Sequence, residues 1–265
     1  MSNIALGRYI PYDSLLHRLD PRIKISAMFL YLIAVFLPVG FLGYGILGAV
    51  LLLGVLMSKI KLSFILKSMR PMLFMLIFLL IINVFVIKTG VPLFSVLSLT
   101  VYSDALIQVF YIMVRLLLMI TVTTILTATT KPLDLTLGIE DLLGPLKRFK
   151  VPAHEIAMMI SIALRFIPTL IDETYRIMKA QASRGVDLKE GKMREKVMGI
   201  LSLIIPLFVS SFQRAEDLAD AMEARGYFPG KTRTRYKQLK IKRADILFLM
   251  FTGTVLAGMI VLVIL

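Results

Sequence analysis

Several residue types that support chemistry are missing or rare in this sequence. Its 265 residues include no cysteine, which excludes disulfide bonds, thiolate metal sites and cysteine nucleophiles. The two histidines, His17 and His154, stand far apart without ligand spacing around them, so we expect polar surface roles and no metal binding. The long apolar runs contain almost no Asp, Glu or His. This argues against a membrane-embedded enzyme, which would need such residues in clusters.

Apolar residues, in contrast, are abundant, with a hydrophobic content of 58% and a mean hydropathy of +0.83. Residues 25–58 carry no charge and are too many for one span, and Pro38 and Gly40 interrupt them, so we predict two helices there. Each later apolar run approaches the ~20 residues that cross a bilayer. The predicted spans are 26–38, 42–57, 71–87, 105–128 and 246–265.

The start of the chain lacks the pattern of a cleaved signal peptide, because residues 1–24 are polar and punctuated by proline. We therefore expect the spans to be permanent. The sequence predicts an all-α integral membrane protein with about five transmembrane helices.

The basic residues are distributed very unevenly over this topology. Lys and Arg number 31, and all but Lys88 and Arg115 fall in segments that five spans would place on one side. Because short loops rich in Lys and Arg stay in the cytoplasm, we predict a cytoplasmic N-terminus and a C-terminus outside. Membrane topology and anionic headgroups thus explain the net charge of +14, and we predict no nucleic-acid partner.

The segment between the fourth and fifth spans alternates apolar and charged residues at helical spacing. The chain therefore divides into three predicted parts. They are residues 1–130 with the first four spans, residues 131–243 as a cytoplasmic set of long amphipathic coupling helices, and residues 244–265 as the fifth span.

Two long helices are expected within the cytoplasmic part, after a short amphipathic stretch at 133–146. The first begins at Pro152, since proline suits the first turn of a helix, and the second begins near Arg194. Pro168 in the first helix predicts a kink or break, and Pro206 is expected to interrupt the second.

Both long helices end in nearly the same way, with AQASRG at 180–185 and AMEARG at 221–226. Glycine ends a helix cheaply by taking the left-handed conformation, and the small residue before the arginine lets another surface approach. One such arginine is most simply explained as complementing the helix macrodipole, but two copies favour docking of the guanidinium to a cytosolic partner. The predicted coupling residues are Ser183, Arg184, Gly185, Ala224, Arg225 and Gly226.

Arg115 lies in the middle of the fourth span, where a charge costs at least ~2.5–3.5 kcal/mol on insertion scales. We expect it to bond internally to a carbonyl or to a polar residue such as Asn83, with substrate binding as the less favoured alternative. GYFPGKT at 226–232 resembles a phosphate-binding loop, but it has three residues between its glycines where four are needed. We therefore expect no nucleotide site on this chain.

The sequence resembles the transmembrane T component of energy-coupling factor (ECF) transporters, a group that includes the cobalt-transporter membrane subunits. The resemblance covers nearly the whole chain and rests on an ordered set of motifs. They are LHRLDPRIKI before the first span, TATTKPLDLTLGIEDLLGPLKRFKVP after the fourth, ALRFIPTLIDE in the first long helix, and both Arg-Gly endings.

The resemblance implies a scaffold in a prokaryotic cell membrane with two kinds of partner. Two ABC-type ATPases would lie below it and carry the ATP and Mg²⁺, and a separate membrane S component would bind the vitamin or metal. The triplets Ser183-Arg184-Gly185 and Ala224-Arg225-Gly226 would enter the two ATPases. The chain itself would bind no cofactor and catalyse no reaction.

A basic membrane insertase is the remaining alternative, since it shares the span count and places a lone arginine in a hydrophilic cavity. It would not need duplicated Arg-Gly endings, and it would purify without ATPases. The sequence leaves the transported substrate open.

Overall fold

A computed structural model describes residues 9–96, 99–145, 152–186, 193–228 and 239–264. These residues belong to two units, and each is described by itself. The bundle unit consists of residues 7–153 and 239–265, and the pair unit of residues 154–238. Part of the GYFPGKT stretch, from residue 229 onward, lies outside the described residues.

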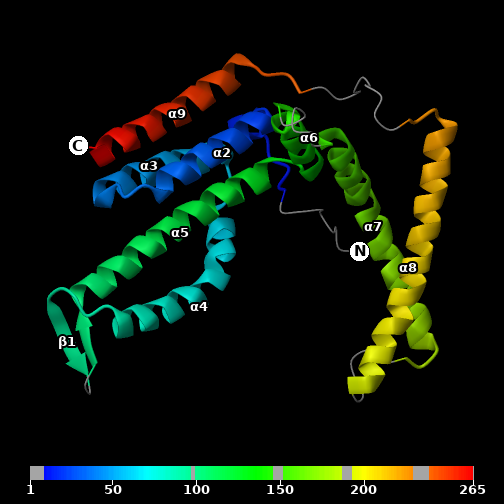
Figure 1. Cartoon of the computed structure of the whole chain (residues 1–265), viewed down its shortest axis with the longest axis horizontal. Coiled ribbons are helices and arrows are strands. Elements are labelled where there is room, and N and C mark those ends of the chain that lie inside the picture. Colours follow the sequence, from blue (N-terminus) through cyan, green and yellow to red (C-terminus); the bar gives the residue numbers. More distant parts are fainter. Residues whose placement is uncertain (1–8, 97–98, 146–151, 187–192, 229–238, 265) are drawn as a thin grey trace. The chain divides into compact units, whose positions relative to one another are not determined.

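The bundle unit contains all five predicted spans (Figure 1). Its helices are packed so that α2 contacts α5, α6 and α9, while α5 also contacts α3 and α4. The helices are α1 (Leu15–Arg18), α2 (Pro21–Phe36), α3 (Gly40–Ser58), α4 (Leu62–Val86), α5 (Ser103–Thr129), α6 (Pro132–Leu142) and α9 (Arg243–Ile264). The pair unit consists of α7 (Ala153–Ser183) and α8 (Met193–Ala224).

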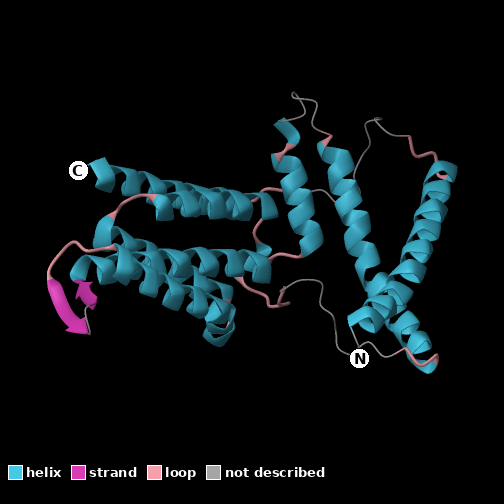
Figure 2. Cartoon of the chain, turned by 60° about the horizontal axis from the view of Figure 1, so that its bottom comes forward, coloured by secondary structure: helices cyan, strands magenta, loops and turns pink. Residues whose placement is uncertain are grey.

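The all-α prediction is confirmed, with one addition. Two short antiparallel strands, β1 (Pro92–Val96) and β2 (Leu99–Tyr102), join α4 to α5. Figure 2 shows this hairpin at one end of the bundle, beside elements that are helical throughout the rest of the described chain. The sequence analysis treated these residues only as a connection.

Six described helices are long and apolar enough to cross a membrane, which agrees roughly with the predicted number of about five. Four of them, α3, α4, α5 and α9, correspond to predicted spans. The first predicted span is α2, which is shorter at 16 residues. The other two are α7 and α8, which the sequence analysis had placed in the cytoplasmic part.

Three prolines lie inside helices and do not end them. Pro71 was predicted to start the third span, yet α4 begins nine residues earlier at Leu62 and bends along its length (Figure 1). A helix break at Pro168 or Pro206 is also not found, because α7 and α8 are helical through both positions. A proline removes one backbone hydrogen bond, and the ladder on either side continues the helix.

The core of the bundle unit lies where α2, α3 and α5 meet. Val35, Leu47 and Ala128 are among its most buried side chains. Two tyrosines fasten α2 to α3 reciprocally: Tyr31 donates to the carbonyl of Leu47 at 2.9 Å, and Tyr44 donates to that of Val35 at 3.2 Å. Each phenol thereby satisfies its own hydroxyl inside an apolar core.

A partly buried cluster of charged residues, which we call the polar junction, joins the N-terminal ends of α2 and α9 to α6. It consists of Asp20, Arg22, Asp141 and Asp245. Asp245 is only 1% exposed and accepts hydrogen bonds from the backbone N–H groups of Asp20 at 2.8 Å and Lys242 at 2.6 Å. Arg22 forms ion pairs with Asp20 at 3.0 Å and Asp141 at 3.4 Å.

Asp20 also caps α2, because its carboxylate accepts from the Arg22 N–H at 2.9 Å. Burial opposes ionisation of Asp20, but the hydrogen bonds from Arg22 outweigh it and lower the pKa of this carboxyl below its usual value. The helix α6 approaches α2 closely at Gly138, where an added Cβ would stand 3.1 Å from Ile25 and 3.3 Å from the Arg22 nitrogen. The described fold therefore groups α6 with the bundle, and the division into 1–130, 131–243 and 244–265 stays a prediction.

We predict that Asp245→Asn lowers the free energy of unfolding by about 1–3 kcal/mol, because one of two buried backbone N–H groups loses its acceptor. Thermal unfolding in mild detergent measures the effect. Asp217→Asn, at an exposed position of α8, is the matched control and should leave the unfolding temperature unchanged. Equal unfolding temperatures for both variants would contradict a structural role for Asp245.

Candidate functional site: two matching helix ends

The pair unit is held together by polar contacts between α7 and α8. Near the end of α7, the side-chain amide of Gln181 donates to the carbonyl of Ser202 at 3.1 Å. Further back along α7, Glu173 lies 3.9 Å from Arg214. Because residue numbers rise along α7 as they fall along α8, the two helices run antiparallel.

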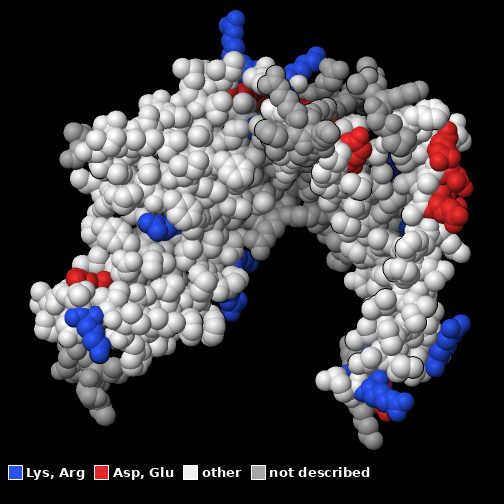
Figure 3. All heavy atoms as spheres, viewed as in Figure 1, with Lys and Arg blue, Asp and Glu red and all other residues white. Residues whose placement is uncertain are grey.

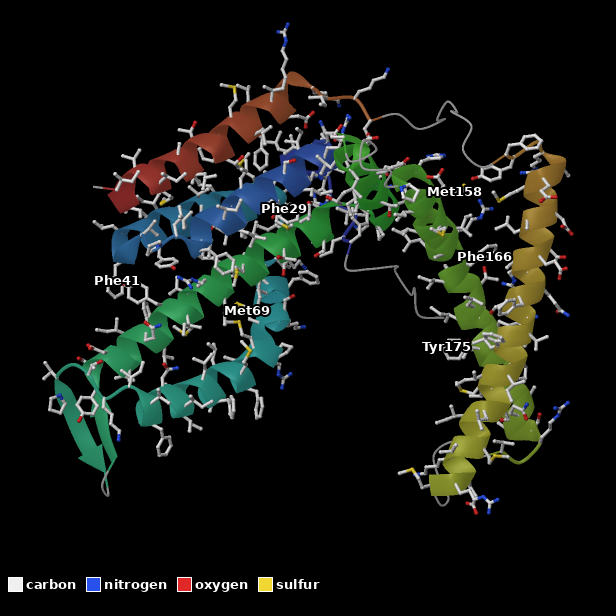
Figure 4. All side chains as sticks on the ribbon, viewed as in Figure 1. Phe29, Phe41, Met69, Met158, Phe166 and Tyr175 are labelled. Atoms are coloured by element: carbon white, nitrogen blue, oxygen red, sulfur yellow. The ribbon has the colours of Figure 1, made fainter. Side chains whose placement is uncertain are left out.

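Much of the apolar surface of this pair is exposed. Figure 4 shows Met158, Phe166 and Tyr175 at successive positions along α7. On α8, the rings of Phe208 and Phe212 contact each other in a tilted arrangement with centroids 4.6 Å apart, yet each residue is 61% exposed. Exposed apolar surface on this scale indicates contact with lipid or with another protein.

The two predicted coupling triplets have the same backbone structure. In the first, Gly185 donates to the carbonyl of Ala182 and Val186 to that of Gln181, both at 3.0 Å. These bonds form a Schellman motif, in which the glycine after the last turn takes a positive φ, here +82°. The side chain of Ser183 donates to the carbonyl of Ala180 at 2.9 Å.

The second triplet repeats this arrangement after α8. Gly226 donates to the carbonyl of Glu223 at 2.8 Å, and Tyr227 donates to that of Met222 at 2.9 Å. The φ of Gly226 is +72°. Each glycine is required for its backbone angle and not for space, since an added Cβ would meet nothing within 4 Å at either position.

Both arginines are presented to the surroundings. Arg184 and Arg225 each occupy the residue between the last helical turn and the glycine, and both are exposed. Within the described parts of the chain, neither guanidinium forms an ion pair. Their five-donor forks are therefore free to bind a carboxylate or a carbonyl on another molecule.

The antiparallel packing places the two arginines at opposite ends of the pair. The end of α7 lies beside Ser202, and 23 further residues of α8 lead from there to Arg225. At 1.5 Å per residue this separates the two arginines by about 35 Å along α8. Acidic residues gather on the C-terminal half of α8 before Arg225 (Figure 3). They are Glu216, Asp217, Asp220 and Glu223.

The structure assigns Arg115 a partner that the sequence analysis did not identify. Its Nε and Nη2 donate to the hydroxyl of Tyr44 at 3.1 and 2.9 Å, and its guanidinium lies 5.7 Å from the ring centroid of Phe36. Asn83, the suggested partner, instead donates to the Leu79 carbonyl of its own helix at 2.8 Å. The guanidinium thus binds a side chain of the bundle, and the same Tyr44 hydroxyl donates to the carbonyl of Val35.

Comparison with known proteins gives consistent matches over most of the chain. The family described as CbiQ, cobalt transport protein, matches residues 13–236. An energy-coupling factor transporter transmembrane protein EcfT from Lactococcus lactis is 45% identical over 245 residues, which are 92% of each chain. Proteins of the same name from Bacillus subtilis and Listeria innocua are 42% and 44% identical, over 90% and 98% of each chain.

We predict that Tyr44→Phe destabilises the bundle by about 1–3 kcal/mol, because the partly buried guanidinium of Arg115 loses its acceptor. Tyr111→Phe is the matched control, since this ring neighbours Tyr44 at 5.7 Å and its hydroxyl is not the one bonded to Arg115. Thermal unfolding of both variants, together with Arg115→Leu and the double variant, gives a double-mutant cycle. The two changes should be clearly less than additive, and simple additivity would contradict the coupling.

Proposed function

The chain belongs to the CbiQ family of cobalt transport proteins and is the transmembrane component of an energy-coupling factor transporter; on this basis we propose that its two Arg-Gly helix ends dock into two ABC-type ATPases. The observation that carries the proposal is the identity of the two ends. Both have a Schellman motif, a glycine with positive φ and an exposed arginine at the same position.

The separation of the two ends supports a pair of ATPase subunits. Arg184 and Arg225 follow different helices and are separated by about 35 Å along the axis of α8. They therefore need two receiving grooves, on two identical or two different subunits. The exposed fork of Arg184 or Arg225 would bind acceptor oxygens in each groove. Ser183 and Ala224, both small, would let the groove wall approach the last helical turn.

ATP and Mg²⁺ belong on the partner ATPases in this proposal, and this chain binds neither of them directly. The support is the incomplete phosphate loop at 226–232, which has one residue too few between its glycines. The chain is then a non-catalytic subunit of an importer, and hydrolysis by its partners supplies the energy.

The substrate, a vitamin or a metal ion, would be bound by a separate membrane S component. The exposed apolar surface of the pair unit, which includes Phe208 and Phe212, supports contact with such a membrane partner. Movement of the ATPases would shift the arginine tips, and the Gln181–Ser202 and Glu173–Arg214 contacts would transmit that movement between α7 and α8. The apolar surface would then pass the movement to the S component.

We place this assembly in a prokaryotic cell membrane with the ATPases in the cytoplasm. The concentration of Lys and Arg on one side of the predicted topology supports a cytoplasmic N-terminus and a C-terminus outside.

We predict that Arg184→Ala and Arg225→Ala each weaken binding to the ATPases by about tenfold or more, because each removes charge-assisted hydrogen bonds worth ~1.5–3 kcal/mol. Arg→Lys at either site should give an intermediate loss, since lysine keeps the charge but lacks the planar fork. Co-purification of the ATPases and vesicle uptake measure the effect. Lys179→Ala, at an exposed position of α7, is the control for a lost positive charge. Normal uptake and co-purification in the double Arg→Ala variant would refute the docking role.

We further predict that the purified chain alone hydrolyses no ATP and binds neither vitamin nor metal tightly. Adding the two ATPases should produce ATP hydrolysis, and only a further S component should produce uptake into vesicles. Titration calorimetry on the chain alone, followed by stepwise reconstitution, tests this. Saturable high-affinity solute binding by the lone chain would overturn the scaffold assignment, and purification without any ATPase would favour the insertase alternative.

A further inference from the structure

The bundle unit contains a half-open groove between α2, α3, α5 and α9, closed at one end by α1. Its volume is about 630 Å³, within the range of ~300–1,000 Å³ typical of ligand pockets. Leu51, Ile125 and Phe248 are among the side chains that line its walls, which are almost entirely apolar. We call it the α2–α9 groove.

The depth of the groove corresponds to part of one bilayer leaflet. On α2 its lining extends from Lys24 to Tyr31, and on α9 from Ala244 to Thr252. At 1.5 Å per residue these stretches are about 10–12 Å long, compared with ~15 Å for half of the hydrocarbon core. The groove therefore begins near the ends of the helices, and its length is less than half the thickness of the hydrocarbon core.

One end of the groove is basic. Lys24 and Lys242 line it there, together with the carboxylate of Asp245. Arg18 also lines this end, but its guanidinium is paired with the carboxylate of Asp13. The Asp245 carboxylate already accepts from two backbone N–H groups. The ammonium of Lys24 donates to neutral oxygens, the carbonyls of His17 and Thr129 and the hydroxyl of Thr130, at 3.1–3.4 Å.

From this arrangement we propose that the α2–α9 groove binds an anionic phospholipid, with one acyl chain along its apolar walls and the phosphate at its basic end. Because Asp13 neutralises Arg18, the mouth carries the charges of Lys24 and Lys242 against the carboxylate of Asp245, and this net positive charge complements an anionic headgroup better than a zwitterionic one. This site is independent of the proposed docking of ATPases.

The size of the groove favours an acyl chain over a helix of a partner. The lined stretches of α2 and α9 are only about two helical turns long, which is too short to seat a partner helix along its length. An acyl chain is thinner and flexible, and it can follow the irregular walls. On the orientation proposed above, the basic end faces the cytoplasmic leaflet, where anionic lipids attract basic residues.

Gly54 of α3 offers a way to fill the groove without disturbing the bundle. It lines the groove, and an added Cβ would contact only the Cδ1 of Ile125, at an ordinary 3.9 Å. Gly48, on the same helix but outside the lining, has no neighbour within 4 Å and serves as the matched control. Lys242 has a similar control in Lys240, which is exposed and does not line the groove.

Native mass spectrometry of the full chain, incubated in mild detergent with phosphatidylglycerol or phosphatidylcholine, tests the proposal. The wild-type chain should retain one phosphatidylglycerol in preference to phosphatidylcholine. Gly54→Leu should reduce that retention several-fold, whereas Gly48→Leu should not. Lys242→Gln should lower the preference for phosphatidylglycerol by about fivefold, and Lys240→Gln should leave it unchanged.

Equal retention of both lipids by the wild-type chain would overturn the proposal, as would normal retention by Gly54→Leu. Should Gly54→Leu fail to fold, the exposed Lys242→Gln variant still decides the question. A photoreactive group on Gly54→Cys, unique because the chain has no other cysteine, extends the test to the assembled transporter. A lipid adduct supports the site, and a protein adduct shows that a partner occupies the groove instead.

Discussion

Polar groups inside the bundle unit must find their partners within the protein, because hydrocarbon offers none. This constraint accounts for the best-defined contacts of the unit. Tyr31 and Tyr44 each bond a carbonyl of the neighbouring helix, and Arg115 reaches the Tyr44 hydroxyl. Even the hydroxyl of Thr121 donates to the carbonyl four residues back, at 2.7 Å. The apolar side chains fill the space between these bonds, but the bonds determine which helices are neighbours.

At the ends of the helices, charged side chains supply the partners that backbone polar groups need. Asp245 accepts from two backbone N–H groups, and Lys24 donates to the carbonyl of Thr129, the last residue of α5, where a cation also complements the helix dipole. These contacts join segments that lie more than 100 residues apart in the sequence. The pair unit follows a different rule, since much of its apolar surface has no cover within the chain. The bundle unit is cross-linked by internal hydrogen bonds, whereas the pair unit exposes much apolar surface. This combination suits the proposed scaffold, which would receive movement from other subunits.

The features that the sequence predicted well are those set by local chemistry. Runs of apolar residues identify helices by length, and Gly185 and Gly226 end helices because they take a positive φ at little cost. The prolines were harder, because their effect depends on the surrounding helix. Pro71 lies inside α4 rather than at its start, and helices continue through Pro168 and Pro206.

Contacts between distant segments could not be predicted from one sequence. Arg115 clearly needed a partner, but nothing in the spacing favoured Tyr44 over Asn83, because the choice depends on how α3 packs against α5. The role of Asp245 had a weak signal, as a lone carboxylate at the start of the last span. Its acceptance from Asp20, 225 positions away, follows only from the packing of α2 against α9. The two arginines proposed for docking could be identified because each lies beside its own glycine, whereas the partners proposed for them would be other chains.

The antiparallel course of α7 and α8 has a mechanical consequence. When two partners that hold the opposite ends of such a pair move toward each other by equal amounts, the helices slide past one another by the sum of the two movements. Parallel helices held at adjacent ends would instead travel together and hardly change their contacts. An antiparallel pair therefore converts a small closure of two subunits into a larger shear along a single seam, without any bending of its helices.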